Sequence, residues 1–271
     1  MKTKGLAAPY LVWMAIFTLV PLGIVLFYAL TDSVSGSFTL ANLARIGSYM
    51  PIFLKSVWLA ILSSAICLVI GYPVAYYIAS CSPMKQRFLY MLLMLPMCMS
   101  FLLRTLAWVA LLEDTGIINS VITSMGLRPL PLIRNGGAVV LGMVYNYLPF
   151  MILPIYSVIV KLDYSLLEAA RDLGANNVTV FRKVILPLSL PGVLSGITMV
   201  FVPSVSTFAI SRMLGGGTEL LLGDLIERQF LGGAYNPQLG AAISLVMMII
   251  VVICMLVMNR FGEGEEQAVM L

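Results

Sequence analysis

Long apolar stretches separated by short polar segments dominate the chain. Six windows are apolar over the roughly 20 residues that a helix needs to cross the hydrocarbon core of a bilayer. They are residues 7–30, 52–80, 88–112, 138–160, 188–210 and 239–258. Prolines interrupt several of these windows, which packed membrane helices tolerate. The pattern predicts an all-α integral membrane protein, with six transmembrane helices in a single domain over residues 1–271.

The polar segment of residues 161–187 differs from the other connections because it carries helix signals of its own. Ser165 and Glu168 have the spacing of a capping box, which predicts a helix starting directly after Ser165. Gly174 can adopt the left-handed conformation that ends such a helix, and Asn176 can cap a second one. We therefore expect two short amphipathic helices outside the bilayer, whose apolar faces need a partner protein.

Composition supports the membrane interpretation and excludes several kinds of chemistry. The 271 residues are 61% hydrophobic and 10% charged, more apolar surface than a soluble protein of this size can bury. Histidine, a common proton shuttle and metal ligand, is absent. The four cysteines lack the spacing of a disulfide framework or a metal site, so no metal is expected. The net charge of +4 gives no indication of a nucleic-acid partner.

The distribution of Lys and Arg predicts the orientation, because cytoplasmic loops carry the excess of basic residues. With a cytoplasmic N-terminus, the inner segments hold Lys2, Lys4, Lys85, Arg87, Lys161, Arg171, Arg182, Lys183 and Arg260. The outer segments then hold Arg45, Lys55, Arg128, Arg134, Arg212 and Arg228. This bias predicts that both termini and the 161–187 loop lie in the cytoplasm.

The 161–187 loop resembles the cytoplasmic loop of type I ABC importer permeases. The pattern Glu-Ala-Ala, then Gly, then Ile-Leu-Pro is filled here by Glu168, Ala169, Ala170, Gly174, Ile185, Leu186 and Pro187. The resemblance implies that the two short helices dock on an ATP-hydrolysing subunit and carry its motion to the membrane helices. On the competing interpretation, Glu168 only completes the capping box with Ser165.

The resemblance extends over nearly the whole chain and narrows to the spermidine/putrescine permease family, and within it to the B-type permease subunit. The segments that carry it are residues 71–76, 103–108, 116–119, 145–149, 214–217, 223–226 and 229–230. It implies a bacterial inner-membrane complex with a homologous C-type permease, two ATP-binding cassette subunits and an extracytoplasmic substrate-binding protein. Transport would proceed by alternating access.

No phosphate-binding loop of the Gly-Lys-Ser/Thr type occurs in the chain. We therefore expect a subunit that is not an enzyme and holds no cofactor, with ATP and Mg²⁺ bound by the partner ATPase.

Carboxylates and aromatic rings are the groups that would contact a polyamine, through ion pairing and cation–π attraction. Asp224 and Glu227 lie one turn apart in a predicted outer helix over residues 220–231. The alternative for these two is a solvated face or a dock for the binding protein. Tyr145, Tyr147 and Phe208 are further candidates for the substrate path, with ordinary packing as their alternative.

Two arginines are candidates for a gate or an interface. Arg104 is an ionisable residue well inside an apolar window, where a charge is costly to insert. It either faces the path or the sister permease, or it pairs near the helix end with Glu113 or Asp114.

Arg212 stands where relatives in the resembled family often carry an acidic residue, and would repel a polycation. This departure leaves another small cationic or zwitterionic solute as an alternative.

Rival functions make different demands on the sequence. A secondary transporter driven by an ion gradient would need intramembrane carboxylates, and none lies in a window core. An intramembrane hydrolase would need a Ser–His pair or an acidic pair inside a span. The sequence has neither, because it has no His and no acidic pair in a window. A purely structural scaffold would not explain the complete coupling-loop pattern.

Overall fold

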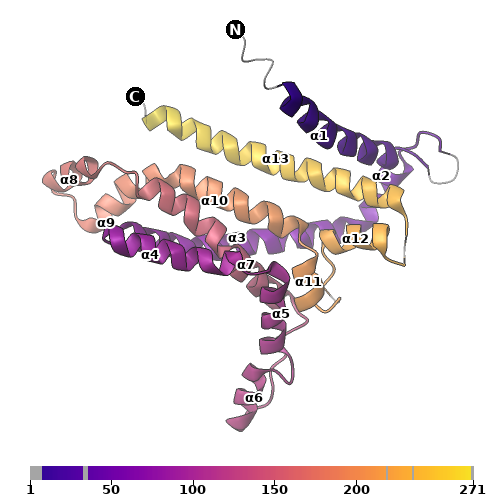
Figure 1. Cartoon of the computed structure of the whole chain (residues 1–271), viewed down its shortest axis with the longest axis horizontal. Helices are drawn as coiled ribbons and strands as arrows, with labels where there is room; N and C mark the ends of the chain where they lie inside the picture. Colours follow the sequence, from indigo (N-terminus) through magenta and orange to yellow (C-terminus); the bar gives the residue numbers. More distant parts are fainter. Residues whose placement is uncertain (1–7, 33–35, 218, 234, 270–271) are drawn as a thin grey trace.

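The computed structural model describes residues 8–32, 36–217, 219–233 and 235–269, and the side chains of these residues except 8, 11 and 259–269. The described chain is almost entirely helical (Figure 1). The α-helices are α1 (Ala8–Ala29), α2 (Ala41–Arg45), α3 (Met50–Ala79), α4 (Pro83–Met94), α5 (Phe101–Leu112), α6 (Ile117–Ser124), α7 (Gly136–Ile159), α8 (Tyr164–Asp172), α9 (Asn177–Val180), α10 (Leu186–Ser206), α11 (Ala209–Leu214), α12 (Leu222–Leu231) and α13 (Pro237–Val269). The all-α prediction is confirmed.

Three shorter segments differ from the α-helical geometry. They are the 3₁₀ turns η1 (Ile46–Tyr49) and η2 (Leu95–Cys98) and the π-helical turn η3 (Phe181–Ile185). Lys2 and Lys4, which the orientation prediction counts, lie outside the described residues, as does the side chain of Arg260.

Five of the six predicted spans are long continuous apolar helical runs. The third window, residues 88–112, is not one straight helix. Its two parts, Pro83–Cys98 and Phe101–Ser124, meet at an angle of 87°. Pro96 lies in the 3₁₀ turn that precedes the bend, where it has no backbone N–H to continue an α-helix, and the chain is extended at Met99. In Figure 1, α5 and α6 project away from the bundle after α4.

Helices α3, α7 and α10 pack against one another and form the centre of the bundle. The approach of α10 to α7 depends on two glycines. A Cβ at Gly192 would lie 2.9 Å from the Pro154 carbonyl oxygen, and one at Gly196 would lie 3.0 Å from the Met151 carbonyl oxygen. Small residues spaced four apart permit this closeness between membrane helices. Helix α1 lies beside α13 at the edge of the bundle and leaves most of its apolar side chains exposed.

The loop between α7 and α10 confirms two sequence predictions and corrects two. Gly174 has φ of +83°, and the Asn176 side chain accepts a hydrogen bond from the Thr179 backbone N–H at 2.8 Å, as expected. However, α8 begins at Tyr164 and its cap is Asp163, so the predicted capping box from Ser165 is wrong. The second helix is also not separate, because the helical run continues from α9 through η3 into α10.

Candidate functional site

Two candidate sites lie at opposite ends of α10 (Figure 1). At one end, the residues of the Glu-Ala-Ala pattern lie on or beside α8, and no residue of this helix is buried. Glu168 and Ala169 are exposed, and Leu173 directly after the helix is 89% exposed. A hollow of about 480 Å³ lies beside them, lined by Gly174 and Lys183 among others. Apolar side chains that remain exposed at a helix end are typical of a surface that binds a protein partner.

Of the remaining predicted coupling residues, Ala170 is half-buried and lines the same hollow. Ile185 is buried at the end of η3, and Pro187 occupies the first turn of α10. Ile185 therefore anchors the loop to the bundle, whereas Pro187 is exposed.

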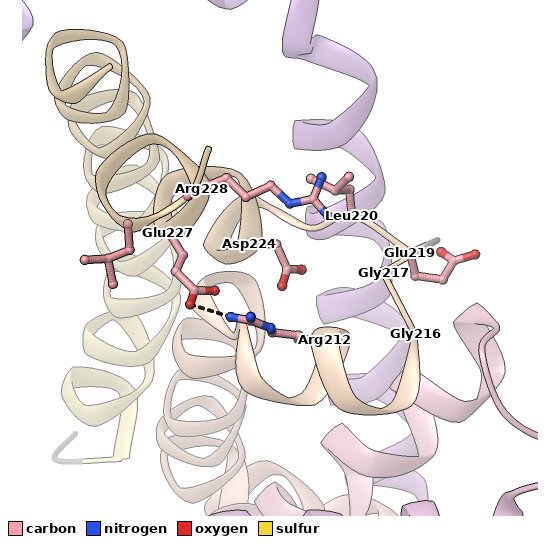
Figure 2. Close-up of a pocket in the computed structure, with 10 residues that line it drawn as sticks. Arg212, Gly216, Gly217, Glu219, Leu220, Asp224, Glu227 and Arg228 are labelled. Atoms are coloured by element: carbon pink, nitrogen blue, oxygen red, sulfur yellow. Dashed lines mark hydrogen bonds and ion pairs between the residues drawn. The ribbon is translucent and has the colours of Figure 1, made fainter. Parts of the chain in front are cut away.

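At the other end of α10, α11 and α12 enclose a polar pocket of about 440 Å³ (Figure 2). Its charged lining residues are Arg212, Glu219, Asp224, Glu227 and Arg228. The close packing of α12 on the end of α10 depends on Gly223, where a Cβ would lie 2.6 Å from the Ser206 and Thr207 carbonyl oxygens. The pocket therefore brings three carboxylates and two guanidinium groups together.

Asp224 is the buried carboxylate of this pocket. One carboxylate oxygen accepts a hydrogen bond from the Leu221 backbone N–H at 3.1 Å, which caps the start of α12. Burial raises the pKa of Asp224 above its usual value, although hydrogen bonds from Ser211 and Leu221 and the charge of Arg228 act against this rise. A cation in the pocket would relieve the cost of ionising this group.

Arg212 does not present an unopposed charge, because it is ion-paired. Its guanidinium group contacts the Glu227 carboxylate at 2.6 Å (Figure 2). Glu219 forms an ion pair with Lys55 of α3. Because each of these carboxylates has a cationic partner, Asp224 is the pocket carboxylate that is held mainly by neutral groups.

The aromatic candidates are spread over the bundle and do not line this pocket. Tyr145 of α7 packs edge-on against Trp108 of α5, with ring centroids 5.4 Å apart. Tyr147 is buried, and its hydroxyl group donates to the Pro203 carbonyl oxygen at 3.5 Å. Phe208 is 48% exposed at the break between α10 and α11. None of the three lines the pocket, although the Phe208 carbonyl oxygen accepts a hydrogen bond from Ser211, which also hydrogen-bonds Asp224.

Arg104 is buried in α5, and among the described residues it forms no ion pair with Glu113 or Asp114, which was one of its two alternatives from the sequence. Among the described residues, its Nε and Nη1 atoms have no hydrogen-bond partner. Glu113 instead lies 3.9 Å from Arg134. Leaving buried guanidinium nitrogens without a hydrogen bond is costly to the folded chain.

Sequence reasoning missed three parts of these sites. Glu219 and Arg228 line the pocket, but nothing in the local sequence distinguishes them from solvated surface charges. The aromatic cluster of Phe181 with Tyr72 and Tyr76 was also missed, although an aromatic residue next to a coupling motif is a signal that could have found it.

Comparison with known proteins identifies the family. Residues 5–263 match the family model described as binding-protein-dependent transport system inner membrane component. The chain belongs to this family. It is therefore an inner-membrane component of an ABC importer, and the transporter assignment from the sequence is confirmed.

Individual relatives narrow the resemblance. The chain is 35% identical over 262 residues to the spermidine/putrescine transport system permease protein PotB of Haemophilus influenzae, covering 93% of this chain and 91% of that protein. It is 37% identical over 227 residues to PotB of Escherichia coli K12, covering 82% of each. The inner membrane ABC transporter permease protein YdcU of the same strain is 30% identical over 267 residues, covering 93% of this chain and 85% of that protein.

Solved structures agree on the fold. A bacterial ABC transporter involved in the import of the acidic polysaccharide alginate matches with a TM-score of 0.81 at 15% identity, covering 96% of this chain and 94% of that chain. The MetNI methionine ABC transporter in an inward-facing conformation matches with a TM-score of 0.61 at 19% identity, covering 80% of this chain and 95% of that chain. The type I ABC importer permease fold expected from the sequence is confirmed.

Proposed function

We propose that this chain is the B-type permease subunit of an ATP-driven importer that carries spermidine and putrescine inward by alternating access. The observation that carries the proposal is the similarity to spermidine/putrescine permeases over most of the chain. The chain itself is non-catalytic in this proposal. ATP and Mg²⁺ are bound by two ATP-binding cassette subunits, and a C-type sister permease completes the pore.

The 161–187 loop is the proposed contact with an ATP-binding cassette subunit, which places this loop and both chain termini in the cytoplasm. The exposure of Glu168, Ala169 and Leu173 supports this role, because the membrane helices would otherwise end in an unpartnered apolar surface. The polar pocket at the far end of α10 then faces the extracytoplasmic binding protein. In this arrangement α10 joins the ATP-driven end of the chain to the solute-facing end.

The polar pocket is the proposed place where an ammonium group of the solute first meets this subunit. Asp224 carries a buried carboxylate whose ionisation a cation would favour, and Glu227 lies beside it. Tyr145, Tyr147 and Phe208 remain candidates for contacts further along the path. Arg104 and Arg212 remain candidates for a gate or an interface.

A zwitterionic solute is the second candidate, since the pocket offers guanidinium groups as well as carboxylates. Arg212 and Arg228 could hold a solute carboxylate while Asp224 holds an ammonium group. A polyamine has no group for these arginines.

Uptake of labelled spermidine and putrescine into vesicles with the reconstituted complex tests the proposal. The expected result is ATP-dependent uptake that unlabelled polyamines block and amino acids do not. Uptake of another solute by the same complex, with no polyamine transport, would keep the importer and exclude the polyamine. Glu168→Lys is expected to abolish uptake and to release the ATPase while membrane insertion persists.

A further inference from the structure

Phe181 joins the proposed coupling loop to a membrane helix that is distant in the sequence. It begins η3, between the short helix α9 and the long helix α10. Its ring packs edge-on against Tyr72 and Tyr76 of α3, with ring centroids 5.7 Å and 5.5 Å apart and interplanar angles of 89° and 77°. Both distances lie in the range of favourable edge-to-face aromatic pairs.

A hydrogen bond continues this contact deeper into the bundle. The Tyr72 hydroxyl lies 2.8 Å from the Ser189 hydroxyl of α10, and both residues are buried. Tyr72 therefore touches the run from η3 to α10 twice, through Phe181 at its ring and through Ser189 at its hydroxyl. Two contacts a short distance apart hold α3 in a fixed position on this run more firmly than one contact would.

The first coupling helix, α8, has no comparable attachment to α3. A cavity of about 540 Å³ separates it from the ends of α3 and α7, lined by Tyr76 and Ile159 on the bundle side and by Leu167 and Arg171 on the α8 side. Helix α8 contacts α9 and η3 instead. A displacement of α8 can therefore reach α3 through the segment that carries Phe181, besides the short chain connection to α7, which also packs on α3.

Phe181 is the first residue of a π-helical turn. Residues Phe181–Ile185 form a turn wider than the α-helix on either side. Such π-helical turns are uncommon and are frequent at functional sites. Here the turn lies where the exposed loop becomes a buried membrane helix, next to the buried residues Val180 and Ile185.

We propose that Phe181 is a positioning residue that transmits the displacement of the coupling loop to α3 through Tyr72 and Tyr76. This inference rests on the proposed function of the 161–187 loop as the ATPase contact. Covalent continuity already joins the loop to α10, and Phe181 adds a second connection. With both in place, α3 and α10 move together when the ATPase subunits close.

The test uses the complete complex of this permease, its sister, the ATPase subunits and the binding protein. Phe181→Ala is expected to leave ATPase co-purification and basal ATP hydrolysis unchanged. The number of solute molecules transported per ATP is expected to fall about tenfold, within the range typical of coupling between sites. Phe181→Tyr keeps the ring and is expected to retain the wild-type ratio. A purely structural role would instead lower complex yield and hydrolysis together.

A matched control exists in the aromatic pair of Tyr90 and Tyr156, whose ring centroids are 5.8 Å apart. It joins α4 to α7, and neither ring belongs to the coupling loop. Tyr90→Ala is therefore expected to leave the transport-to-hydrolysis ratio unchanged. An equal fall in this control would overturn the assignment to Phe181.

A second variant keeps the inference testable if Phe181→Ala fails to assemble. Tyr76→Leu removes one of the two α3 rings that Phe181 contacts, and in combination with Phe181→Leu the two effects should be less than additive. A wild-type ratio of transport to hydrolysis in Phe181→Ala would exclude the connection between Phe181 and α3. If Phe181→Ala does not assemble, the same result in Tyr76→Leu would exclude it. If Glu168→Lys uncouples transport in the same assay, only this inference fails; normal transport in Glu168→Lys would remove the coupling loop assignment itself.

Discussion

The guanidinium group of Arg212 lies 2.6 Å from the carboxylate of Glu227 and joins α11 to α12 across the polar pocket (Figure 2). This ion pair occupies a carboxylate that a cationic solute could otherwise use. Arg212→Gln should therefore lower the KM for polyamine uptake, by about two- to fivefold at low ionic strength, the range expected for an exposed ion pair. The decrease should shrink at high salt, where exposed charges are screened.

Uptake rates measured over a range of solute concentrations at two ionic strengths check this prediction. Arg128→Gln is the matched control, because Arg128 is also an exposed arginine of a predicted outer segment but lies outside the pocket. A KM for Arg212→Gln that equals the wild-type value at both ionic strengths would exclude Arg212 from the entry route.

Asp224 should make solute uptake depend on pH. Its raised pKa means that the carboxylate is protonated at a higher pH than an ordinary Asp, so cation binding weakens as the pH falls through this value. The KM of the wild type should rise over that pH interval. Asp224→Asn should have a high KM throughout and no such step, with Asp114→Asn, an exposed carboxylate outside the pocket, as the control.

The raised pKa of Asp224 also makes the folding stability of the chain depend on pH. Because folding raises the pKa of Asp224, the contribution of this carboxyl group to stability is fully present below the unfolded-state pKa and is lost as the pH rises through the folded-state value. Glu227, Glu219, Arg212 and Arg228 face the same pocket and are unchanged in Asp224→Asn. A pH profile of KM that is identical in wild type and Asp224→Asn would therefore show that another group titrates.

The effect of substituting Gly174 should depend on how readily the new residue adopts its left-handed backbone conformation. Its φ of +83° lies in the left-handed region, and no atom lies within 4 Å of the position that a Cβ would occupy. Gly174→Val should cost about 1–3 kcal/mol of backbone strain, and Gly174→Asn should cost less because Asn adopts this region more readily. ATPase co-purification and uptake should fall in the order wild type, Asn, Val.

Gly126 provides the control for this series. It has φ of +79° and equally open surroundings, but it follows α6, away from the coupling loop. Gly126→Val introduces comparable strain and should leave ATPase co-purification unchanged. Equal behaviour of Gly174→Val and wild type in both assays would contradict the role of this turn.

Replacement of Arg104 should stabilise the isolated permease. Its buried Nε and Nη1 atoms have no hydrogen-bond partner among the described residues, and each such group costs about 1–3 kcal/mol. Arg104→Met should therefore raise the thermal unfolding midpoint of the purified chain in detergent, while Arg104→Lys should not. A lower midpoint for Arg104→Met would show that the guanidinium is satisfied in the folded protein.

Gly192 should be more sensitive to a single added methyl group than a glycine in α1. A Cβ at Gly192 would meet the Pro154 carbonyl oxygen at 2.9 Å, whereas one at Gly23 would meet nothing within 4 Å. Gly192→Ala should cost about 1–3 kcal/mol through overpacking between α10 and α7. The yield of monodisperse protein after heating in detergent should fall for Gly192→Ala and stay constant for Gly23→Ala.

Local features were predictable because they depend on neighbouring residues. The apolar windows identified the spans, since crossing a bilayer requires only length and hydrophobicity. The left-handed turn at Gly174 and the cap at Asn176 were also correct, because each involves backbone groups within a few residues. The cap at Ser165 failed because Asp163, two residues earlier, captures the Ser165 backbone N–H at 3.0 Å.

By itself, the sequence determined the all-helical class, the membrane spans and the coupling-loop pattern. Only the tertiary structure decided the 87° bend after α4, the ion pair that offsets Arg212, and the contact of Phe181 with α3. These features depend on which distant segments pack together, as for Tyr72 and Ser189, which are 117 residues apart and share a hydrogen bond. Hydrophobic periodicity identifies the buried face of each helix, but side-chain packing between helices selects the partner that the face meets.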